Sequence, residues 1–385
     1  MQVQCTVRSS LLGVGFVVQH VFALILTISV STSLWAQSRQ LPTWLLMLAP
    51  GHGRGPGDSV DSQIRTPQQV SKAFARAEAG SAHDQFLIGY SYAKGLGQAQ
   101  DYSKALVWYE KAANRGDTAA ITELGRMYAQ GTGVTQNYDK ALQWFRRAAA
   151  DGYAPAQTGL GLLYFEGLGT SRDEAAAARW WEKAADQAYA PATSNLGFAY
   201  LNGSGVPHDS DKAVLLFRKA AESGVATAQF NLGSCYELGE GVARDLTAAA
   251  KWYRIAAQQG HSEAQNNLGV LYQSGQGISQ DIMSALRLYL LSAGNGNAKA
   301  AVNLAKVFHG SASLKPDHVL AYMWLKVAAA WGEDVSEALR AEGALLNGRE
   351  LAKGNGEAAD WISQHRVNSS STNLSSSLLE MRRQR

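Results

Sequence analysis

The stretch that decides the fold runs from Ala228 to Gly260 and reads AQFNLGSCYELGEGVARDLTAAAKWYRIAAQQG. Apolar residues recur in it every three or four positions, which is the spacing of one face of an α-helix. The pair Gly239 and Gly241 divides the stretch, and glycine readily takes the left-handed conformation that ends a helix. Asp245 follows, a residue type that accepts hydrogen bonds from the first amides of a helix. The stretch therefore predicts two helices joined by a tight turn.

The same pattern recurs every 36 residues, from about residue 82 to residue 332, without an insertion. A lone helix pair cannot bury both of its apolar faces, so neighbouring pairs must stack on one another into a superhelix. The small residues of the first helices are Gly89, Gly125, Gly161, Gly197, Gly233, Gly269 and Ala305, and the residues expected to start the second helices are Asp101, Asn137, Asp173, Asp209, Asp245, Asp281 and Asp317.

A glycine inside each first helix needs an explanation, because it costs about 1 kcal/mol of helix propensity relative to alanine. We expect the missing side chain to let the two helices of a repeat approach closely. For Gly125, the residues expected to pack into this space are Trp144 and Ala148 of the second helix.

The unit A-x-x-x-L-G-x-x-Y-x-x-G-x-G-V, followed by D-x-x-x-A-x-x-W-[YF]-x-x-A-A-x-x-G, resembles the Sel-one-like repeat family, a relative of the tetratricopeptide repeats. The resemblance covers about two thirds of the chain. It implies an all-α fold: a right-handed α/α superhelical solenoid of seven 36-residue helix-turn-helix repeats with capping helices. It also implies an adaptor or scaffold function. One exported branch of the family carries paired cysteines and is linked to penicillin binding, but this chain lacks those cysteines.

The N-terminal segment has the order of an export signal. A positive charge at Arg8, an apolar run from Leu11 to Val30 and the segment from Ser31 to Ala36 follow one another. We expect residues 1–36 to be a cleaved signal peptide, which predicts a periplasmic or secreted protein. An uncleaved anchor is the main alternative, since about 20 apolar residues can span a bilayer, and a cytoplasmic protein is the other.

The rest of the chain divides by periodicity. The N-terminal side of the array has no sustained period before Thr66, whereas the C-terminal side ends in a serine-rich tail. The expected parts are a flexible linker at 37–65, an N-terminal capping helix at 66–80, seven repeats at 81–332, C-terminal capping helices at 333–366 (from Glu333 to Leu346 and from Glu357 to Gln364) and a disordered tail at 367–385.

Composition narrows the classes of partner. Apolar residues make up 46% of the chain and charged residues 17%, and the formal net charge is +3. This balance predicts no nucleic-acid partner. Cys5 would leave with the signal peptide, so the mature chain would keep only Cys235 and form no internal disulfide. We expect Cys235 to be a buried structural thiol.

Two sets of residues on the first helices that do not repeat as core residues are candidates for partner binding, because the resemblance assigns these helices to the concave side. Amide side chains suit the backbone of an extended peptide, and apolar side chains at variable positions suit a binding hot spot. The alternatives are amide bonds within each repeat and ordinary packing between first helices. The amide set is Asn195, Asn231, Asn267 and Asn303, and the apolar set is Leu162, Phe165, Phe198, Leu201 and Phe230.

No motif in the sequence predicts catalysis, a cofactor or a metal. The eight histidines are scattered without metal-ligand spacing, and we expect His83 and His309 to be solvated polar residues. The Gly-x-Gly pairs follow helices, whereas nucleotide-binding glycines follow a strand. Ser91 and Lys94 form an isolated Ser-x-x-Lys on a repeat helix, which we interpret as coincidence.

These observations predict an exported adaptor, scaffold or regulator that is not an enzyme and that binds a peptide or helix of a partner protein on the concave repeat surface. We expect a monomer that meets the membrane only if the N-terminal segment stays uncleaved. Two alternatives remain open: an envelope enzyme or cell-wall binding protein related to peptidoglycan or β-lactams, and a membrane-anchored assembly scaffold.

Overall fold

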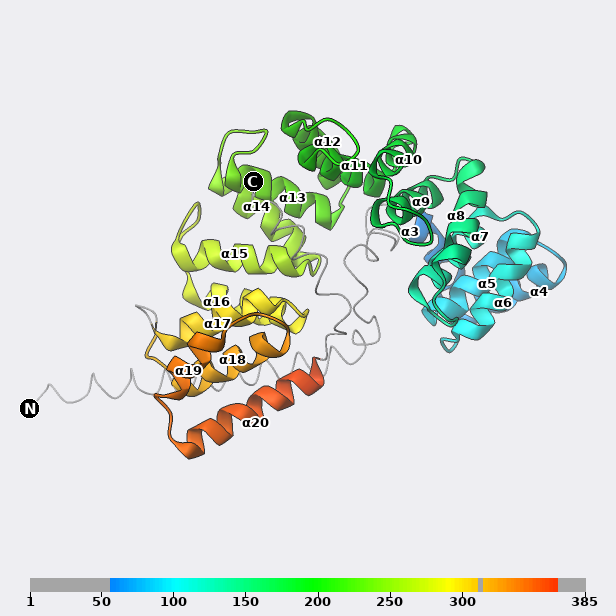
Figure 1. Cartoon of the computed structure of the whole chain (residues 1–385). Coiled ribbons are helices and arrows are strands. Elements are labelled where there is room, and N and C mark those ends of the chain that lie inside the picture. Colours follow the sequence, from blue (N-terminus) through cyan, green and yellow to red (C-terminus); the bar gives the residue numbers. More distant parts are fainter. Residues whose placement is uncertain (1–55, 311–313, 366–385) are drawn as a thin grey trace, which may run out of the picture. The chain divides into compact units, whose positions relative to one another are not determined.

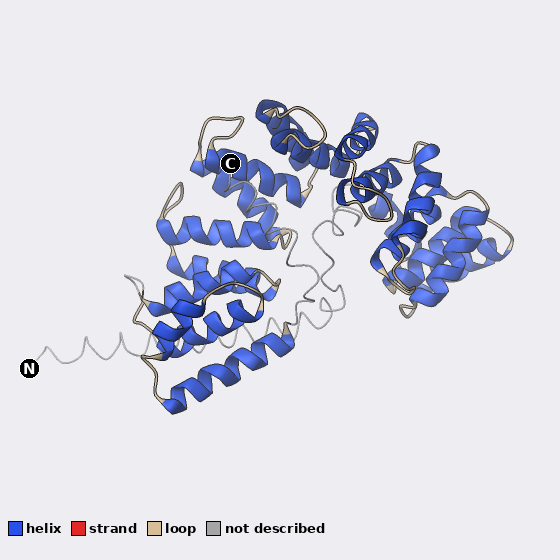
Figure 2. Cartoon of the chain, in the orientation of Figure 1, coloured by secondary structure: helices blue, strands red, loops and turns tan. Residues whose placement is uncertain are grey.

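The computed structural model describes residues 56–310 and 314–365, and within its first helix it describes side chains from Val60 onward. These ranges fold into helices joined by short turns and contain no β-strand (Figures 1 and 2). The predicted signal peptide with its cleavage after Ala36, most of the predicted linker and the predicted tail at 367–385 lie outside the described residues.

Helices follow one another in pairs, which confirms the all-α repeat prediction. Each first helix packs against the second helix of its own repeat, and each second helix packs against the next first helix. The first helices are α5 (Ala82–Lys94), α7 (Thr118–Gln130), α9 (Ala154–Glu166), α11 (Ala190–Asn202), α13 (Ala226–Leu238), α15 (Ser262–Ser274) and α17 (Ala298–His309). The second helices are α6 (Tyr102–Asn114), α8 (Tyr138–Ala150), α10 (Glu174–Asp186), α12 (Ser210–Glu222), α14 (Leu246–Gln258), α16 (Ile282–Gly294) and α18 (His318–Ala330).

The predicted helix starts are confirmed at the atomic level. Asp245, for example, accepts hydrogen bonds from the backbone amides of Thr247 and Ala248, and the other six predicted residues cap their helices in the same way. Glycines in the left-handed conformation end the first six first helices, whereas α17 ends at Gly310 with φ 155° and ψ 121°. The seventh turn therefore departs from the other six.

Close approach between the helices of a repeat is confirmed, but the residue that fills the space differs from the prediction. A Cβ added to Gly125 would lie 2.9 Å from Cδ1 of Phe145. Phe145 is fully buried, whereas Trp144 is partly exposed. One residue turns a helix by about 100°, so the aromatic side chain after the tryptophan points at the glycine. The equivalent pairs are Gly89–Tyr109, Gly161–Trp181, Gly197–Phe217, Gly233–Tyr253 and Gly269–Tyr289.

Glutamine side chains join one repeat to the next. The Nε2 atom of Gln265 donates to the backbone oxygen of Ala257 in the preceding repeat at 3.2 Å, and Asn295, which follows α16, donates to Oε1 of Gln265. Gln229 makes the same bond to Ala221 and accepts from Gln259. The amides of Gln229 and Gln265 are buried, so these bonds satisfy polar groups that would otherwise be costly in the interior.

Helices at both ends extend the array. α4 (Pro67–Glu78) starts at Thr66 with a capping box, and α3 (Pro56–Ile64) forms inside the stretch predicted to be a linker. The i, i+4 pair Val60 and Ile64 is buried in the core, which explains why this segment is helical although no period marks it.

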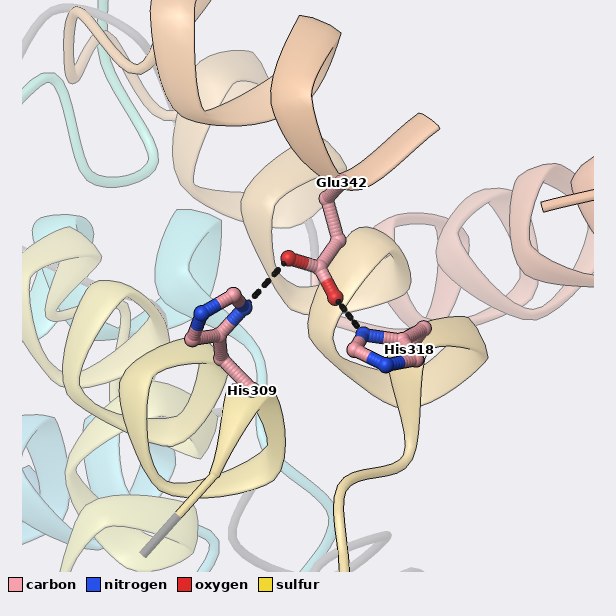
Figure 3. Close-up of side chains that lie close together, drawn as sticks. All are labelled: His309, His318 and Glu342. Carbon is pink, nitrogen blue, oxygen red and sulfur yellow. Dashed lines mark hydrogen bonds and ion pairs between the residues drawn. The ribbon is translucent and has the colours of Figure 1, made fainter. Parts of the chain in front are cut away.

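The C-terminal helices are α19 (Ser336–Gly343) and α20 (Gly348–Gln364). α20 begins nine residues earlier than the predicted Glu357, because Asn347 and Glu350 form a capping box there. Glu342 of α19 lies between His309 and His318, so α19 is tied to the end of α17 and the start of α18 (Figure 3). Within the described ranges, no helix is long and apolar enough to cross a membrane.

Candidate partner-binding surface

The four predicted asparagines lie on successive first helices, α11, α13, α15 and α17. Asn195 is buried, with 5% of its surface exposed, whereas Asn231, Asn267 and Asn303 are partly exposed. The three partly exposed amides are the ones that a partner can reach.

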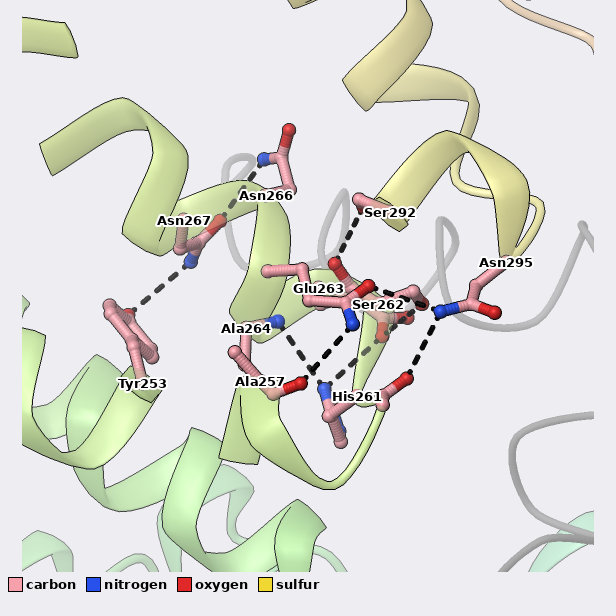
Figure 4. Close-up of polar contacts among 12 residues, drawn as sticks. Tyr253, Ala257, His261, Ser262, Glu263, Ala264, Asn266, Asn267, Ser292 and Asn295 are labelled. Carbon is pink, nitrogen blue, oxygen red and sulfur yellow. Dashed lines mark hydrogen bonds and ion pairs between the residues drawn. The ribbon is translucent and has the colours of Figure 1, made fainter. Parts of the chain in front are cut away.

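Hydrogen bonds join two of these asparagines into a relay across the last three repeats. Asn303 donates to Oδ1 of Asn266 at 2.9 Å, and Asn266 donates to Oδ1 of Asn267 at 3.2 Å. Asn267 in turn donates to the hydroxyl of Tyr253 at 3.3 Å (Figure 4), and Tyr253 donates to Glu237 at 2.5 Å. The bonds of Asn303 and Asn267 thus reach the preceding repeat. Each partly exposed amide of the relay keeps an oxygen or nitrogen with further bonding capacity.

Asn195 and Asn231 stand outside this relay. The Nδ2 atom of Asn195 is buried without a hydrogen-bond partner among the described residues. An unpaired buried amide nitrogen costs about 1–3 kcal/mol, so this position is a weak point of the fold. The side chain of Asn231 is only partly buried, which leaves it open to water.

The predicted apolar set divides into buried and accessible members. Leu162, Phe165 and Leu201 are buried, with 3%, 6% and 5% of their surface exposed. Phe165 packs against Trp181 at 5.4 Å and edge-on against Phe198 at 6.1 Å between ring centroids. These three side chains therefore pack the interior, and a partner can contact Phe198 and Phe230 more readily.

Phe230 lies beside a mostly buried histidine. Its ring stacks on His261 at 4.8 Å between centroids. His261 caps α15, because its Nδ1 accepts the backbone amide of Ala264 at 3.4 Å. Burial lowers the pKa of His261, although Glu263 nearby acts in the opposite direction. Burial thus favours the neutral imidazole, the form that can accept the capping bond.

Polar residues that sequence reasoning missed occupy the same repeat position as Phe165 and Leu201. Glu237 accepts the hydroxyl of Tyr253, and Gln273 accepts the hydroxyl of Tyr289 at 2.7 Å. Burial raises the pKa of both tyrosine hydroxyls, with Glu237 adding to the effect at Tyr253. The 36-residue period could have paired these positions, since both tyrosines share the phase of Phe217.

The serine, histidine and cysteine side chains considered in the sequence analysis lie in different surroundings. Ser91 is fully buried and donates to the backbone oxygen of Leu96 at 2.6 Å, so it serves the local turn. His83 is exposed, as expected. His309, expected to be solvated, has its Nδ1 2.7 Å from Glu342. Cys235 is buried, as predicted for a structural thiol.

The repeat geometry agrees with the comparison to known families. The model of the Sel1 repeat matches seven consecutive segments: 82–117, 118–153, 154–189, 190–225, 226–261, 262–297 and 298–330. The chain belongs to the Sel1 repeat family. Sel1 repeat proteins are generally protein–protein interaction scaffolds.

Two solved structures of Sel1 repeat type resemble this chain. A protective antigen of uropathogenic Escherichia coli strains with an SLR fold is 32% identical, with a TM-score of 0.56; the match covers 77% of this chain and 64% of the antigen. A Sel1 repeat protein from Oxalobacter formigenes is also 32% identical with a TM-score of 0.56, and the match covers 63% of this chain and 96% of that protein. No curated protein matches the sequence.

Proposed function

We propose that this Sel1 repeat protein is an exported, monomeric, non-enzymatic adaptor that holds a peptide segment or helix of a partner protein against its first helices. The observation that carries the proposal is the amide relay of Asn303, Asn266 and Asn267. It orients the partly exposed amides of Asn267 and Asn303, in two adjacent repeats, before any partner binds. Pre-organised amides lose little side-chain entropy on binding, which favours recognition of a peptide backbone.

Accessible apolar side chains lie on the first helices, one of them on the same helix as Asn267, and would take the side chains of the partner. Val270, one turn after Asn266 on α15, has 38% of its surface exposed. Phe198 and Phe230 are partly exposed on α11 and α13. An amide for the backbone and an apolar contact for the side chain are the two elements of extended-peptide recognition.

Export is part of the proposal and has its own test. The order of charge, apolar run and the segment from Ser31 to Ala36 before Gln37 supports cleavage after Ala36. Fractionation followed by N-terminal sequencing of the protein from its native cell is expected to find a chain that starts at Gln37 outside the cytoplasm. A chain that keeps Met1 and stays with membranes would instead indicate an anchored scaffold.

Position-specific photo-crosslinking in the native cell tests the binding surface. A photoreactive residue replaces Val270 in one variant and Leu215 in a matched control, since Leu215 is 63% exposed on the second helix α12. We expect Val270 to capture one polypeptide that Leu215 does not, and Asn267→Ala to reduce its yield. Equal capture at both positions, or capture of a small molecule alone, contradicts the proposal.

A further inference from the structure

Two histidines and a glutamate lie close together at the C-terminal end of the repeat array. The ligand atoms of His309, His318 and Glu342 lie within 4.8 Å of one another (Figure 3). His309 is the last residue of α17, His318 the first of α18, and Glu342 lies in α19. The three residues therefore meet only because α19 docks beside the end of α17 and the start of α18.

The carboxylate of Glu342 is the buried centre of this cluster. Its side chain is 4% exposed, and its two oxygens lie 2.7 Å from Nδ1 of His309 and 2.6 Å from Nδ1 of His318. Burying a carboxylate is costly unless its charge is balanced. Each oxygen accepts from one imidazole, so both rings aim a nitrogen at the same small volume.

We propose that His309, His318 and Glu342 form a binding site for a divalent transition-metal ion of the zinc class. Two imidazole nitrogens and one carboxylate oxygen are donors that Zn²⁺ accepts at about 2.0–2.2 Å. The ion would take the place of the protons between the rings and the carboxylate, and its charge would balance the buried glutamate. Both imidazoles would coordinate through nitrogen lone pairs and keep their remaining protons on the other ring nitrogen.

The geometry needs an adjustment of the side chains in two senses. Tetrahedral ligands at the usual zinc distances stand about 3.3 Å apart, so the nitrogen–oxygen separations of 2.7 and 2.6 Å must lengthen, whereas ligand atoms near the 4.8 Å limit must move closer together. The His309 side chain is 63% exposed at the end of its helix, which leaves it room to move. The His318 side chain is 35% exposed. Solvent on this side can supply a fourth ligand.

The sequence conceals this site because its ligands are far apart along the chain. His309 and His318 are separated by a turn, and Glu342 follows 24 residues after His318. No short metal-binding motif has this spacing. The seventh first helix also ends differently from the other six, and the site lies at that departure.

Calorimetric titration of the full chain, expressed without a polyhistidine tag and stripped of metal with a chelator, tests the proposal with ZnCl₂ as the probe. We expect one ion to bind these three residues and to raise the melting temperature. Loss of a supporting residue beyond the ligands typically weakens zinc binding about 10–100-fold, so His309→Ala, His318→Ala and Glu342→Gln are each expected to weaken it by about 100-fold or more. Cobalt(II) absorption gives a second readout of imidazole and carboxylate coordination.

Two controls keep the result interpretable. His208→Ala removes an exposed histidine whose ring lies near Ser210 and is expected to leave the affinity unchanged. Melting without metal checks that each variant folds, and His309→Ala is the mildest of the three because its side chain is exposed. A wild-type chain that takes up no zinc, or an affinity that none of the three variants lowers, overturns the proposal and leaves the cluster as a hydrogen-bonded tether for α19.

Discussion

The middle of the array carries apolar side chains at a repeat position where the C-terminal part carries polar ones. On α9 and α11 the position holds Phe165 and Leu201, which are buried among apolar neighbours. On α13 and α15 it holds Glu237 and Gln273, which accept tyrosine hydroxyls from the following helices. The backbone frame is the same in both parts, so the frame tolerates either chemistry when the facing aromatic side chain changes with it. Variation at this position can therefore alter the surface while the repeat is retained.

The largest expected effect comes from transferring one half of a polar pair into the apolar part. Leu201→Glu would bury a carboxylate beside Phe217 with no hydroxyl to meet it. We expect a loss on the order of 3–5 kcal/mol in the free energy of unfolding, the usual scale for a buried charge without a partner. Urea denaturation followed by circular dichroism measures it.

The double variant Leu201→Glu with Phe217→Tyr sharpens this test. It recreates the pairing of Glu237 with Tyr253 one repeat earlier and is expected to recover about 0.5–3 kcal/mol as interaction energy. If the double variant is no more stable than the sum of the single changes predicts, the two parts of the array are not interchangeable in the way described.

Glycine–aromatic packing should behave alike along the array, from α7 to α15. Gly125→Leu and Gly269→Leu each force a side chain onto an aromatic ring, since even a Cβ would lie 2.9 Å from Phe145 and 2.7 Å from Tyr289. We expect each to lower the free energy of unfolding by about 1–3 kcal/mol, or more where the backbone cannot move. The matched control is Gly356→Leu in α20, where a Cβ would meet open space. Unchanged melting temperatures for the two core variants would contradict the close-approach argument.

The two tyrosine pairs should differ from each other in strength. Tyr253→Phe removes a hydroxyl from a carboxylate, and Tyr289→Phe removes one from an amide. Hydrogen bonds to charged groups contribute about 1.5–3 kcal/mol and those to neutral groups about 0.5–1.5 kcal/mol. Thermal melting is expected to show the larger loss for Tyr253→Phe, and the reverse order would mean that Glu237 does not act as a charged acceptor.

The smallest expected effect is a pH dependence of stability that arises from His261, in the C-terminal part of the array. The pKa of His261 is lowered in the folded chain by burial. The unfolded chain therefore takes up a proton first, so the stability from neutral His261 is complete above the ordinary pKa of about 6.5 and is lost as pH falls below it. The loss ends once pH passes below the lowered folded value.

His261→Asn separates this contribution from the rest. Asparagine can still cap α15 without titrating, so its melting temperature should fall less than that of the wild type between pH 7 and pH 5. The wild-type fall involves at most the value of one cap and its stacking, about 0.5–2 kcal/mol. His208→Asn is the exposed control, and an equal pH dependence in the wild type and His261→Asn would rule out His261 as the cause.

The period allowed the repeated features to be predicted, and it failed where a feature occurs once. Asp245 and its equivalents were assigned as helix caps because one local rule applies seven times. Phe145 was missed in favour of its neighbour Trp144, because a difference of one residue turns the side chain by about 100° around the helix and the tryptophan is the larger side chain. The helix around Val60 and Ile64 has no repeated counterpart, so only tertiary contact reveals it.

The candidate site was predictable only in part for the same reason. The asparagines of the amide set could be found by their spacing, but the bonds of Asn303 to Asn266 and of Asn267 to Tyr253 depend on how neighbouring repeats dock. Burial of Leu162, Phe165 and Leu201 also depends on docking, since an apolar residue on a first helix suits either an interior or a surface. His309 contacts Glu342 only because α19 docks beside the end of α17, and no periodic rule predicts this contact.

The glutamine bond to the preceding carbonyl has a consequence for how such a chain can change in length. Because Gln229 and Gln265 meet nearly identical acceptors, a duplicated module inserted between α14 and α15 would find a matching neighbour on either side. An insertion of any other size at this point would separate Gln265 from its acceptor Ala257, which lies eight residues earlier. Duplication or deletion of whole repeats is therefore the way in which the array could become longer or shorter and still keep this bond.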